Sequence, residues 1–266
     1  YSMHKPTIGR KFTSSSLTAT TQLSFIIKNY GTVSKSAIPI SYTINSGSVR
    51  NAILNDVITS NDTSIVFFTV HENLSSVGNY AIAAWTTLAG DENKNNDTLY
   101  YTLKHLPNNP IALPFSESFE QTNIQLAKAT FGMNGIEYAD YYPEIESRLR
   151  TNEGDVYSLT GNRALTMDNS REIMQRKNEI IFTYNLSNYV DSVLFFDFNY
   201  MNRSEPDGND TIFARGDDTK PWIPIYNLFE NKGTVGKYKN VAAINLLQKL
   251  KIENGQAFSS STQLKI

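Results

Sequence analysis

The chain has 266 residues, which is enough for two domains of ordinary size, each with a core large enough to fold. Hydrophobic residues make up 40% and charged residues 19%, and the formal net charge is −2, so composition argues against a disordered chain and against a basic nucleic-acid-binding protein. The absence of cysteine excludes disulfides, thiolate metal sites and cysteine nucleophiles. No window approaches the roughly 18 apolar residues of a membrane helix, so no membrane-spanning segment is expected.

Short alternating runs fill the first half of the chain. Apolar and polar residues alternate, and turn residues such as Asn, Asp, Gly and Ser stand between the runs, which read TTQLSFIIK, AIPISYTI, SIVFFTV, NYAIAAWTT and DTLYYTL. A period of two predicts strands that bury one face, and turns at intervals of roughly 8 to 15 residues are typical of an antiparallel sandwich. Ile26 breaks the pattern of its run, because a polar residue is expected at its position.

A proline-rich segment, HLPNNPIALP, divides the sequence. Proline removes the donors that a sheet needs and fixes the chain in an extended form. We therefore expect a first domain at 1–106, a linker at 107–114 and a second domain at 115–266.

Strand candidates also dominate the second half. They are NRALTMD, NEIIFTYNLS, SVLFFDFNYMN, DTIFARG and PWIPIYNL, and they are separated by Asn, Asp, Gly and Pro. The segment VAAINLLQKLKI fits a helical face about as well as a packed strand connection. Together the two halves predict an all-β protein.

Both halves resemble known families. The KNYGT turn, the LSSVGNY turn and the GDENKNNDT hairpin are similar to those of CARDB-like immunoglobulin-type modules in secreted Bacteroidota proteins. LPFSESFE, TGNRALTMD and NRSEPDGNDTIFARGDD resemble the jelly-roll module related to MAM and cleaved-adhesin domains, found in surface proteins exported by the type IX secretion system. The resemblance implies an Ig-like β-sandwich followed by a jelly-roll β-sandwich. It also implies further strands after Ile266, so we expect the jelly roll to be truncated at its C-terminus.

The stretch AGDENKNNDTLYYTL places oxygen-bearing side chains at alternate positions, as the first half of a calcium loop does. The candidate ligands are Asp91, Asn93 and Asp97, with Asn95 between them. An EF-hand loop needs a Gly at its sixth position and a Glu at its twelfth, where this sequence has Asn96 and Thr102. A turn between two strands is therefore the first interpretation, and weak calcium binding is the alternative.

A second acidic cluster follows in the second half. The carboxylates that could gather around a calcium ion at the rim of the jelly roll are Asp207, Asp210, Asp217 and Asp218. A solvated loop is the alternative. The tripeptide Arg215–Asp217, which animal integrins read, is expected to be accidental.

Flat aromatic side chains suit sugar rings, and jelly rolls often host such sites. The candidate ligand-binding residues are Trp222, Tyr226, Tyr141 and Tyr142. Packing is the alternative for each, and Trp85 in its alternating strand is expected in a core.

The sequence gives little support for a catalytic function. His4, His71 and His105 have no matching nucleophile or metal-ligand spacing, and nucleotide and hydrolase fingerprints are absent, so we expect no enzyme activity in this segment. The resemblance does imply short bacterial O-glycosylation motifs, which would place sugar on Thr98, Ser192 and Thr211.

We therefore expect a non-catalytic segment of a secreted or cell-surface bacterial protein. Its β-sandwich modules would present a surface for adhesion to a glycan or protein ligand, without nucleic acid and with no cofactor other than calcium. Two alternatives stay open. The modules could be accessory domains of a secreted protease or glycosidase, or the chain could be a cargo protein bound to the type IX export machinery in the outer membrane.

Overall fold

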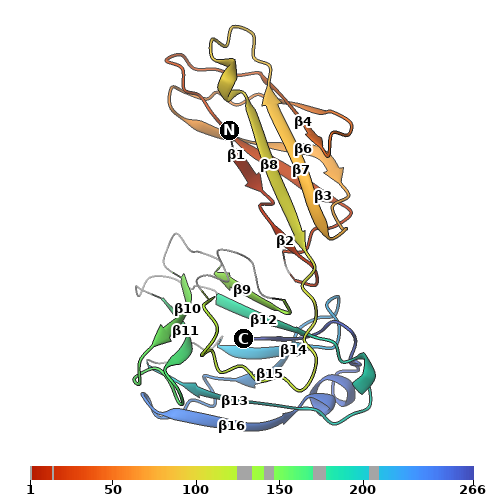
Figure 1. The fold of residues 1–266 in the computed structure, drawn as a ribbon, viewed down its shortest axis with the longest axis vertical. Coiled ribbons are helices and arrows are strands. Elements are labelled where there is room, and N and C mark those ends of the chain that lie inside the picture. Colours follow the sequence, from red (N-terminus) through yellow and green to blue (C-terminus); the bar gives the residue numbers. More distant parts are fainter. Residues whose placement is uncertain (1, 14, 125–133, 141–146, 170–177, 204–209) are drawn as a thin grey trace. The chain divides into compact units, whose positions relative to one another are not determined.

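The computed structural model describes residues 2–13, 15–124, 134–140, 147–169, 178–203 and 210–266. The chain forms two compact units, Tyr1–Pro107 and Asn108–Ile266, and the regular structure of each is mainly strands (Figure 1). The fold is all-β, as the alternating runs predict.

The first unit is an Ig-like β-sandwich of two sheets, ordered β1-β3-β6 and β2-β8-β7-β4-β5. The strands are β1 (Ser2–Lys5), β2 (Gly9–Arg10), β3 (Thr21–Lys28), β4 (Ile38–Ile44), β5 (Arg50–Leu54), β6 (Thr63–Glu72), β7 (Gly78–Thr86) and β8 (Thr98–Leu106). Because β1 pairs with β3 while β2 pairs with β8, the segment Ser2–Arg10 contributes to both sheets.

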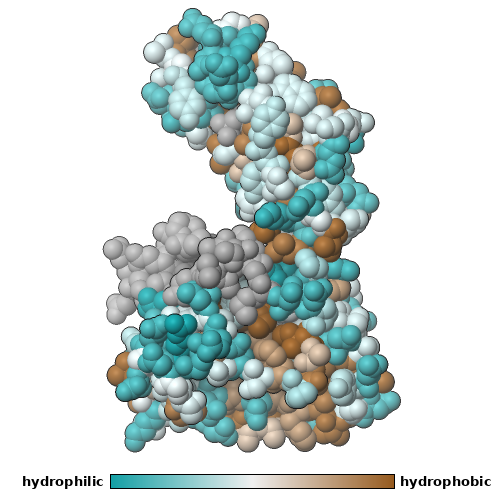
Figure 2. Space-filling model, viewed as in Figure 1, coloured by the Kyte–Doolittle hydropathy of each residue, from teal (hydrophilic) through white to brown (hydrophobic). Residues whose placement is uncertain are grey.

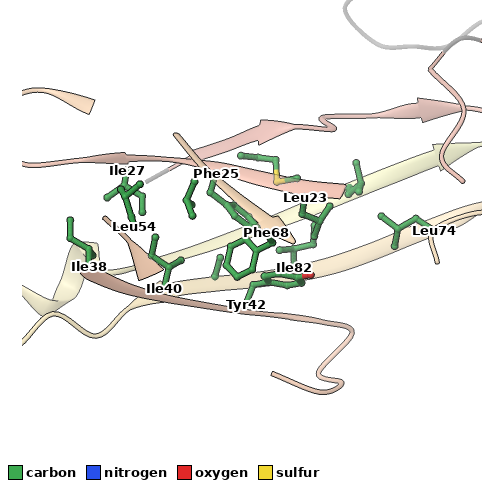
Figure 3. Close-up of a cluster of buried hydrophobic side chains, with 14 of the residues drawn as sticks. Leu23, Phe25, Ile27, Ile38, Ile40, Tyr42, Leu54, Phe68, Leu74 and Ile82 are labelled. Atoms are coloured by element: carbon green, nitrogen blue, oxygen red, sulfur yellow. The ribbon is translucent and has the colours of Figure 1, made fainter. Parts of the chain in front are cut away.

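Three aromatic rings centre the core of the first unit (Figure 3). Phe25 and Phe68 come from β3 and β6 of one sheet, and Tyr42 comes from β4 of the other. The rings of Tyr42 and Phe68 lie 4.6 Å apart at 85°, and those of Phe25 and Phe68 lie 5.7 Å apart at 87°. The edge-to-face contact of Tyr42 with Phe68 joins the two sheets, and that of Phe25 with Phe68 lies within one sheet.

The hydroxyl of Tyr42 has a hydrogen-bond acceptor in the fold. It donates to Oε1 of Glu72 at 2.9 Å, and Nε of Arg50 donates to the same oxygen at 2.8 Å. Burial raises the pKa of Tyr42 well above its ordinary value. The hydrogen bond from Arg50 lowers the pKa of Glu72, with burial opposing it and Tyr42 adding to it. Glu72 thus joins β4, β5 and β6.

The second unit is also a β-sandwich. A five-stranded sheet has the order β15-β14-β17-β12-β9, and two strand pairs, β13-β16 and β10-β11, complete it. The strands are β9 (Ile136–Asp140), β10 (Ser147–Glu153), β11 (Arg163–Asn169), β12 (Asn178–Tyr184), β13 (Phe195–Met201), β14 (Thr211–Arg215), β15 (Ile223–Asn227), β16 (Tyr238–Asn245) and β17 (Thr262–Lys265). The last strand, β17, inserts between β12 and β14, a crossed connection of the kind a jelly roll makes.

One face of the five-stranded sheet forms the core of this unit. Ile180, Ile212 and Leu264 point into it and share a cluster with apolar residues of the two strand pairs. Beyond β16, Leu247–Ile252 forms a helix with π-type hydrogen bonding that buries Leu250. The ambiguous segment VAAINLLQKLKI therefore contains both a strand and a helix.

The segment expected as a linker packs on the second unit. Asn108 is fully buried, and its side chain donates to Oγ1 of Thr183 at 3.4 Å. The amide of Ile111 donates to the carbonyl of Thr183 at 2.7 Å, and the amide of Asn185 donates back to Ile111 at 3.0 Å. The prolines therefore belong to a segment that is bound to the second unit and is not a free tether.

Trp85 is placed differently from the expectation. Ile82 and Ala84 on β7 point into the core, so Trp85 points to the opposite face of the sheet, where it is half-buried. The alternation along β7 is confirmed, but the expected core position of the large ring is wrong.

Glu72→Ala is expected to lower the free energy of unfolding of the first unit by about 2 kcal/mol, because the buried Tyr42 hydroxyl loses its acceptor. Glu72→Gln is expected to cost less, since an amide oxygen still accepts that bond. The lowered folded-state pKa means that the charge of Glu72 stabilises the fold above the unfolded-state pKa, and that this stabilisation is lost as pH falls through the folded-state pKa. Glu72→Gln should remove this part of the pH dependence.

Denaturant unfolding followed by fluorescence checks this. The chain has two tryptophans, so a Trp222→Phe background leaves Trp85 as the reporter of the first unit. Glu92→Ala, at an exposed loop position, is the control. Equal unfolding free energies for the Glu72→Ala and Glu92→Ala variants would contradict the role given to Glu72.

Candidate recognition site

A row of polar side chains crosses the face of the five-stranded sheet that points away from the core. Gln263 on β17 lies directly opposite Thr183 on β12 and Arg215 on β14. Its Nε2 donates to Oγ1 of Thr183 at 2.9 Å, and its Oε1 accepts from Nε of Arg215 at 2.7 Å. Thr183 and Gln263 are fully buried, so these bonds satisfy polar groups that would otherwise be costly.

A second row lies next to the first. Lys265 is directly opposite Ile181 on β12 and Phe213 on β14. Its ammonium group bonds Oε1 of Glu179 at 3.0 Å, and the side chains of Lys265 and Glu179 are only 14% and 8% exposed. A pair this buried holds both side chains in fixed positions.

Both cations meet the indole ring of Trp222, which stands just before β15. The guanidinium of Arg215 lies 4.2 Å from the ring centre, and the ammonium of Lys265 lies 4.7 Å from it. Lys265 also lies 4.8 Å from the ring of Phe213. Burial lowers the pKa of Arg215 from its ordinary value. We call these residues the Trp222 cluster: Phe213, Arg215, Trp222, Gln263 and Lys265.

The loop beside the cluster is fixed by short hydrogen bonds. The amide of Gly216 donates to Oε1 of Gln256 at 2.9 Å, and Nε2 of Gln256 donates to the carbonyl of Pro221 at 2.9 Å. A Cβ atom on Gly216 would lie 2.2 Å from the carbonyl oxygen of Ala257, so only glycine fits. Because Gly216 is buried and Arg215 lies against Trp222, the tripeptide is not presented as an exposed loop.

The described members of the predicted calcium cluster of the second unit lie in separate places, and calcium binding there stays a prediction. Asp210 and Asp217 flank the two ends of β14, a five-residue strand that spans about 16 Å. Oδ1 of Asp217 accepts two bonds from Thr219, which lower its pKa, and Oδ1 of Asp218 accepts from Ser261 at 2.6 Å. Asp207 lies outside the described residues. These carboxylates shape a turn.

The first predicted calcium loop forms the β7–β8 turn. Oδ1 of Asp91 accepts from the amide of Asn93, and Oδ1 of Asn93 accepts from the amide of Asn95 at the start of a 3-10 helix, Lys94–Asn96. Burial and the nearby charge of Asp91 raise the pKa of Asp97. Within the described part of the chain, no three His, Asp or Glu side chains gather as metal ligands. The turn is found, and calcium binding stays a prediction.

The predicted ligand-binding aromatic residues do not lie on one surface. Tyr226 on β15 packs inward, with its ring 5.5 Å from Phe198 and 6.4 Å from Tyr200, whereas Trp222 lies on the outer face. The two side chains therefore cannot stack on one ligand. Tyr141 and Tyr142 lie outside the described residues, so Trp222 is the candidate that the structure places at the surface.

The predicted glycosylation sites differ in exposure. Thr98 is exposed at the first position of β8, whereas Ser192 and Thr211 are half-buried. Thr211 also pairs with Asn227 inside the sheet. Modification at all three stays a prediction.

The first unit has a shallow depression of about 270 Å³ over Arg50 and Glu72. Those two charges bond each other and Tyr42, which accounts for their positions. His105 is 2% exposed, with one ring nitrogen 3.0 Å from the carbonyl of Leu74 and the other 3.5 Å from Oγ of Ser16. These are the contacts of a buried, satisfied histidine.

Sequence reasoning missed most of the Trp222 cluster. Gln263 and Lys265 alternate with Leu264 in β17, which places them on one face. The contact of Gln263 with Arg215, 48 residues earlier, depends on the pairing of β17 with β14, and no local pattern reveals that pairing.

Comparison with known proteins gives only distant similarities. No family model matches the sequence, and no curated protein matches it. A CARDB domain from Pyrococcus furiosus, solved in solution, has a TM-score of 0.31 at 14% identity and covers 40% of this chain and 91% of that domain. A crystal structure of the domain in complex with di-metal ions has a TM-score of 0.30 at 15% identity and covers 40% of this chain and 84% of the domain.

The secreted serine protease VesC from Vibrio cholerae is similar at a TM-score of 0.22 and 12% identity, covering 99% of this chain and 45% of the protease. These similarities assign no ligand to this chain. Among the residues that the structure describes, no helix is both long and apolar enough to cross a membrane.

Lys265→Met is expected to lower the free energy of unfolding of the second unit by about 2 kcal/mol, because it takes the cation from a carboxylate that is nearly buried. The double variant Lys265→Met/Glu179→Gln should recover part of that loss. The control is Lys249→Met, whose pair with Glu253 also has a 3.0 Å contact but is about 40% exposed, so it should change stability by under about 0.5 kcal/mol. Denaturant unfolding of these three variants, each in a Trp85→Phe background that leaves Trp222 as the reporter, measures their free energies of unfolding. Equal losses of stability for Lys265→Met and Lys249→Met would contradict the stabilising role given to the buried pair.

Proposed function

We propose that this chain is a non-catalytic recognition segment of an exported bacterial surface protein, in which the second unit binds a glycan through the Trp222 cluster. The first unit serves as a rigid spacer that helps to hold this surface away from the cell. The observation that carries the proposal is the indole of Trp222, which two cations hold in place while part of the ring stays at the surface.

Rigidity favours recognition. Arg215 is itself fixed by Gln263, and Lys265 is fixed by Glu179, so the aromatic ring rests on side chains that are already ordered. Binding of a ligand to such a ring loses little side-chain conformational entropy, because the ring is already ordered. This improves the affinity for a given contact area.

The chemistry around the ring suits hydroxyl groups. Arg215 and Lys265 supply N–H donors, and the adjacent Asp217 and Asp218 supply carboxylate acceptors within one short loop. Charges of both signs lie close together, so the surface is matched to a polyhydroxylated ligand better than to a strongly charged one. Because Arg215 and Lys265 both lie against the ring, we expect the part of the ring that stays exposed to contact the sugar.

The surface location and the type IX export route are part of the proposal. They are supported by the resemblance of the KNYGT, LSSVGNY and TGNRALTMD motifs to modules of such proteins. Adhesion would then arise from several weak modules acting together. In the alternative, where these units accompany a secreted enzyme, the same cluster would direct that enzyme to its glycan.

Binding of the 266-residue chain to a glycan array, followed by calorimetry with the strongest ligand, tests the proposal. Trp222→Ala should weaken binding about tenfold or more, which corresponds to about 1.4 kcal/mol. Phe229→Ala is the matched control, because this ring is also in the second unit, is 40% exposed and carries Lys232 at 5.0 Å. Equal affinities of the Trp222→Ala and Phe229→Ala variants would show that the Trp222 cluster is not part of the binding site. A chain that binds no glycan on the array would contradict the proposed function.

A further inference from the structure

Strand β6 has an unusually open edge. Among the described residues it pairs only with β3, at the end of the sheet order β1-β3-β6. It is ten residues long, and from Thr63 to Val70 it contains no charged residue and no proline. Long, uncharged edge strands are ready to pair with another strand, and proteins usually protect them.

Four other edge strands of the described sheets are short or carry such protection. β1 and β2 are four and two residues long. β5 has five residues and begins with Arg50, and β15 contains Pro224, which cannot donate to a neighbouring strand. β9 and the strands of the two-stranded sheets β10-β11 and β13-β16 also have an open edge, but β6 is the longest edge strand that the structure describes.

The outward face of β6 is also apolar. Ile65 is 37% exposed and Phe67 is 56% exposed. Ile65 lies directly opposite Ile26, the position on β3 where a polar residue is expected. The rings of His4 and Phe67 are in edge-to-face contact, with their centres 6.0 Å apart. We call Ile26, Ile65 and Phe67 together the β6 surface. An antiparallel sheet with one solvated face normally carries polar side chains there, so this group marks a contact surface.

We propose that β6 pairs with β6 of a second copy of this chain. The stretch Thr63–Phe67 keeps regular register with β3, whereas the ladder is irregular after it. A two-fold axis at Ile65 would use this regular stretch. Ile65 would then face Ile65 of the second copy, and Thr63 would face Phe67 of the second copy, joining two three-stranded sheets into one.

The charge pattern favours this partner over others. Because Thr63–Phe67 contains no charge, self-pairing opposes no like charges. A strand with Lys or Glu on the same face would place that charge beside Ile65 and Phe67 without a partner. A second copy of β6 supplies apolar residues at those positions. The resulting dimer would carry two ligand sites and would gain avidity for a surface that displays many copies of its ligand.

The test is the mass of the 266-residue chain as a function of concentration, measured by sedimentation equilibrium. The weight-average mass should rise from 29.9 kDa toward twice that value as the concentration approaches about 1 mM, where even a weak interface populates a dimer. Ile65→Lys and Ile65→Glu should each abolish the rise, because two like charges would meet at the axis.

An equimolar mixture of the I65K and I65E chains, with no unsubstituted chain present, should restore association. In a two-fold pairing centred on Ile65, the lysine introduced in one copy would face the glutamate introduced in the other, so opposite charges would meet at the axis. Ile53→Lys, at a 61% exposed position on β5, is the matched control and should associate like the unsubstituted chain.

Three results would overturn the proposal. They are a constant mass of 29.9 kDa for the unsubstituted chain, association of the I65K chain alone, and failure of the mixture to recover association. A constant mass of the unsubstituted chain would mean that the β6 surface binds a strand of a different protein instead of a second copy.

Discussion

A strand can bury only one of its two faces against a core, and this constraint organises both units. In the first unit, Phe25, Tyr42 and Phe68 take the inward positions. In the second, Ile180, Ile212 and Leu264 do so.

Whatever the chain recognises must therefore meet residues on outward faces, strand edges or loops. In the space-filling view, hydrophobic side chains gather on the second unit in the region of β13 to β15 (Figure 2). The features that the cores do not explain lie on outward faces, namely the Trp222 cluster and the β6 surface.

The outward face of the second unit is not an ordinary solvated face. Thr183 and Gln263 are fully buried there, and Glu179 is 6% exposed. Burying polar groups is costly unless each finds a partner, so several strands of the sheet contribute the partners that keep these groups satisfied. The result is a fixed base beneath Arg215 and Lys265, which in turn hold Trp222. We interpret these fixed polar positions as support for recognition, since packing alone would be served by apolar residues.

Local patterns predicted the strands well, because period-two alternation is a property of each segment alone. They also predicted the turn at Asp91 and Asn93, where side-chain oxygens accept neighbouring amides. They failed where distant segments decide the outcome. The position of Trp85 in an alternating strand suggested a core position, although its neighbours Ile82 and Ala84 already fill the inward positions. The Arg215–Gln263 contact required knowing that β17 lies beside β14.

The central claim is that a ligand meets the second unit at Trp222. The chain contains only Trp85 and Trp222, so its NMR spectrum should show two indole N–H signals, one from each unit. Titration of the labelled chain with the glycan that binds most tightly would therefore carry its own internal reference. The account predicts that the Trp222 signal shifts in a saturable way while the Trp85 signal stays in place. A bound glycan that leaves the Trp222 signal unchanged, or that shifts the Trp85 signal instead, would contradict it.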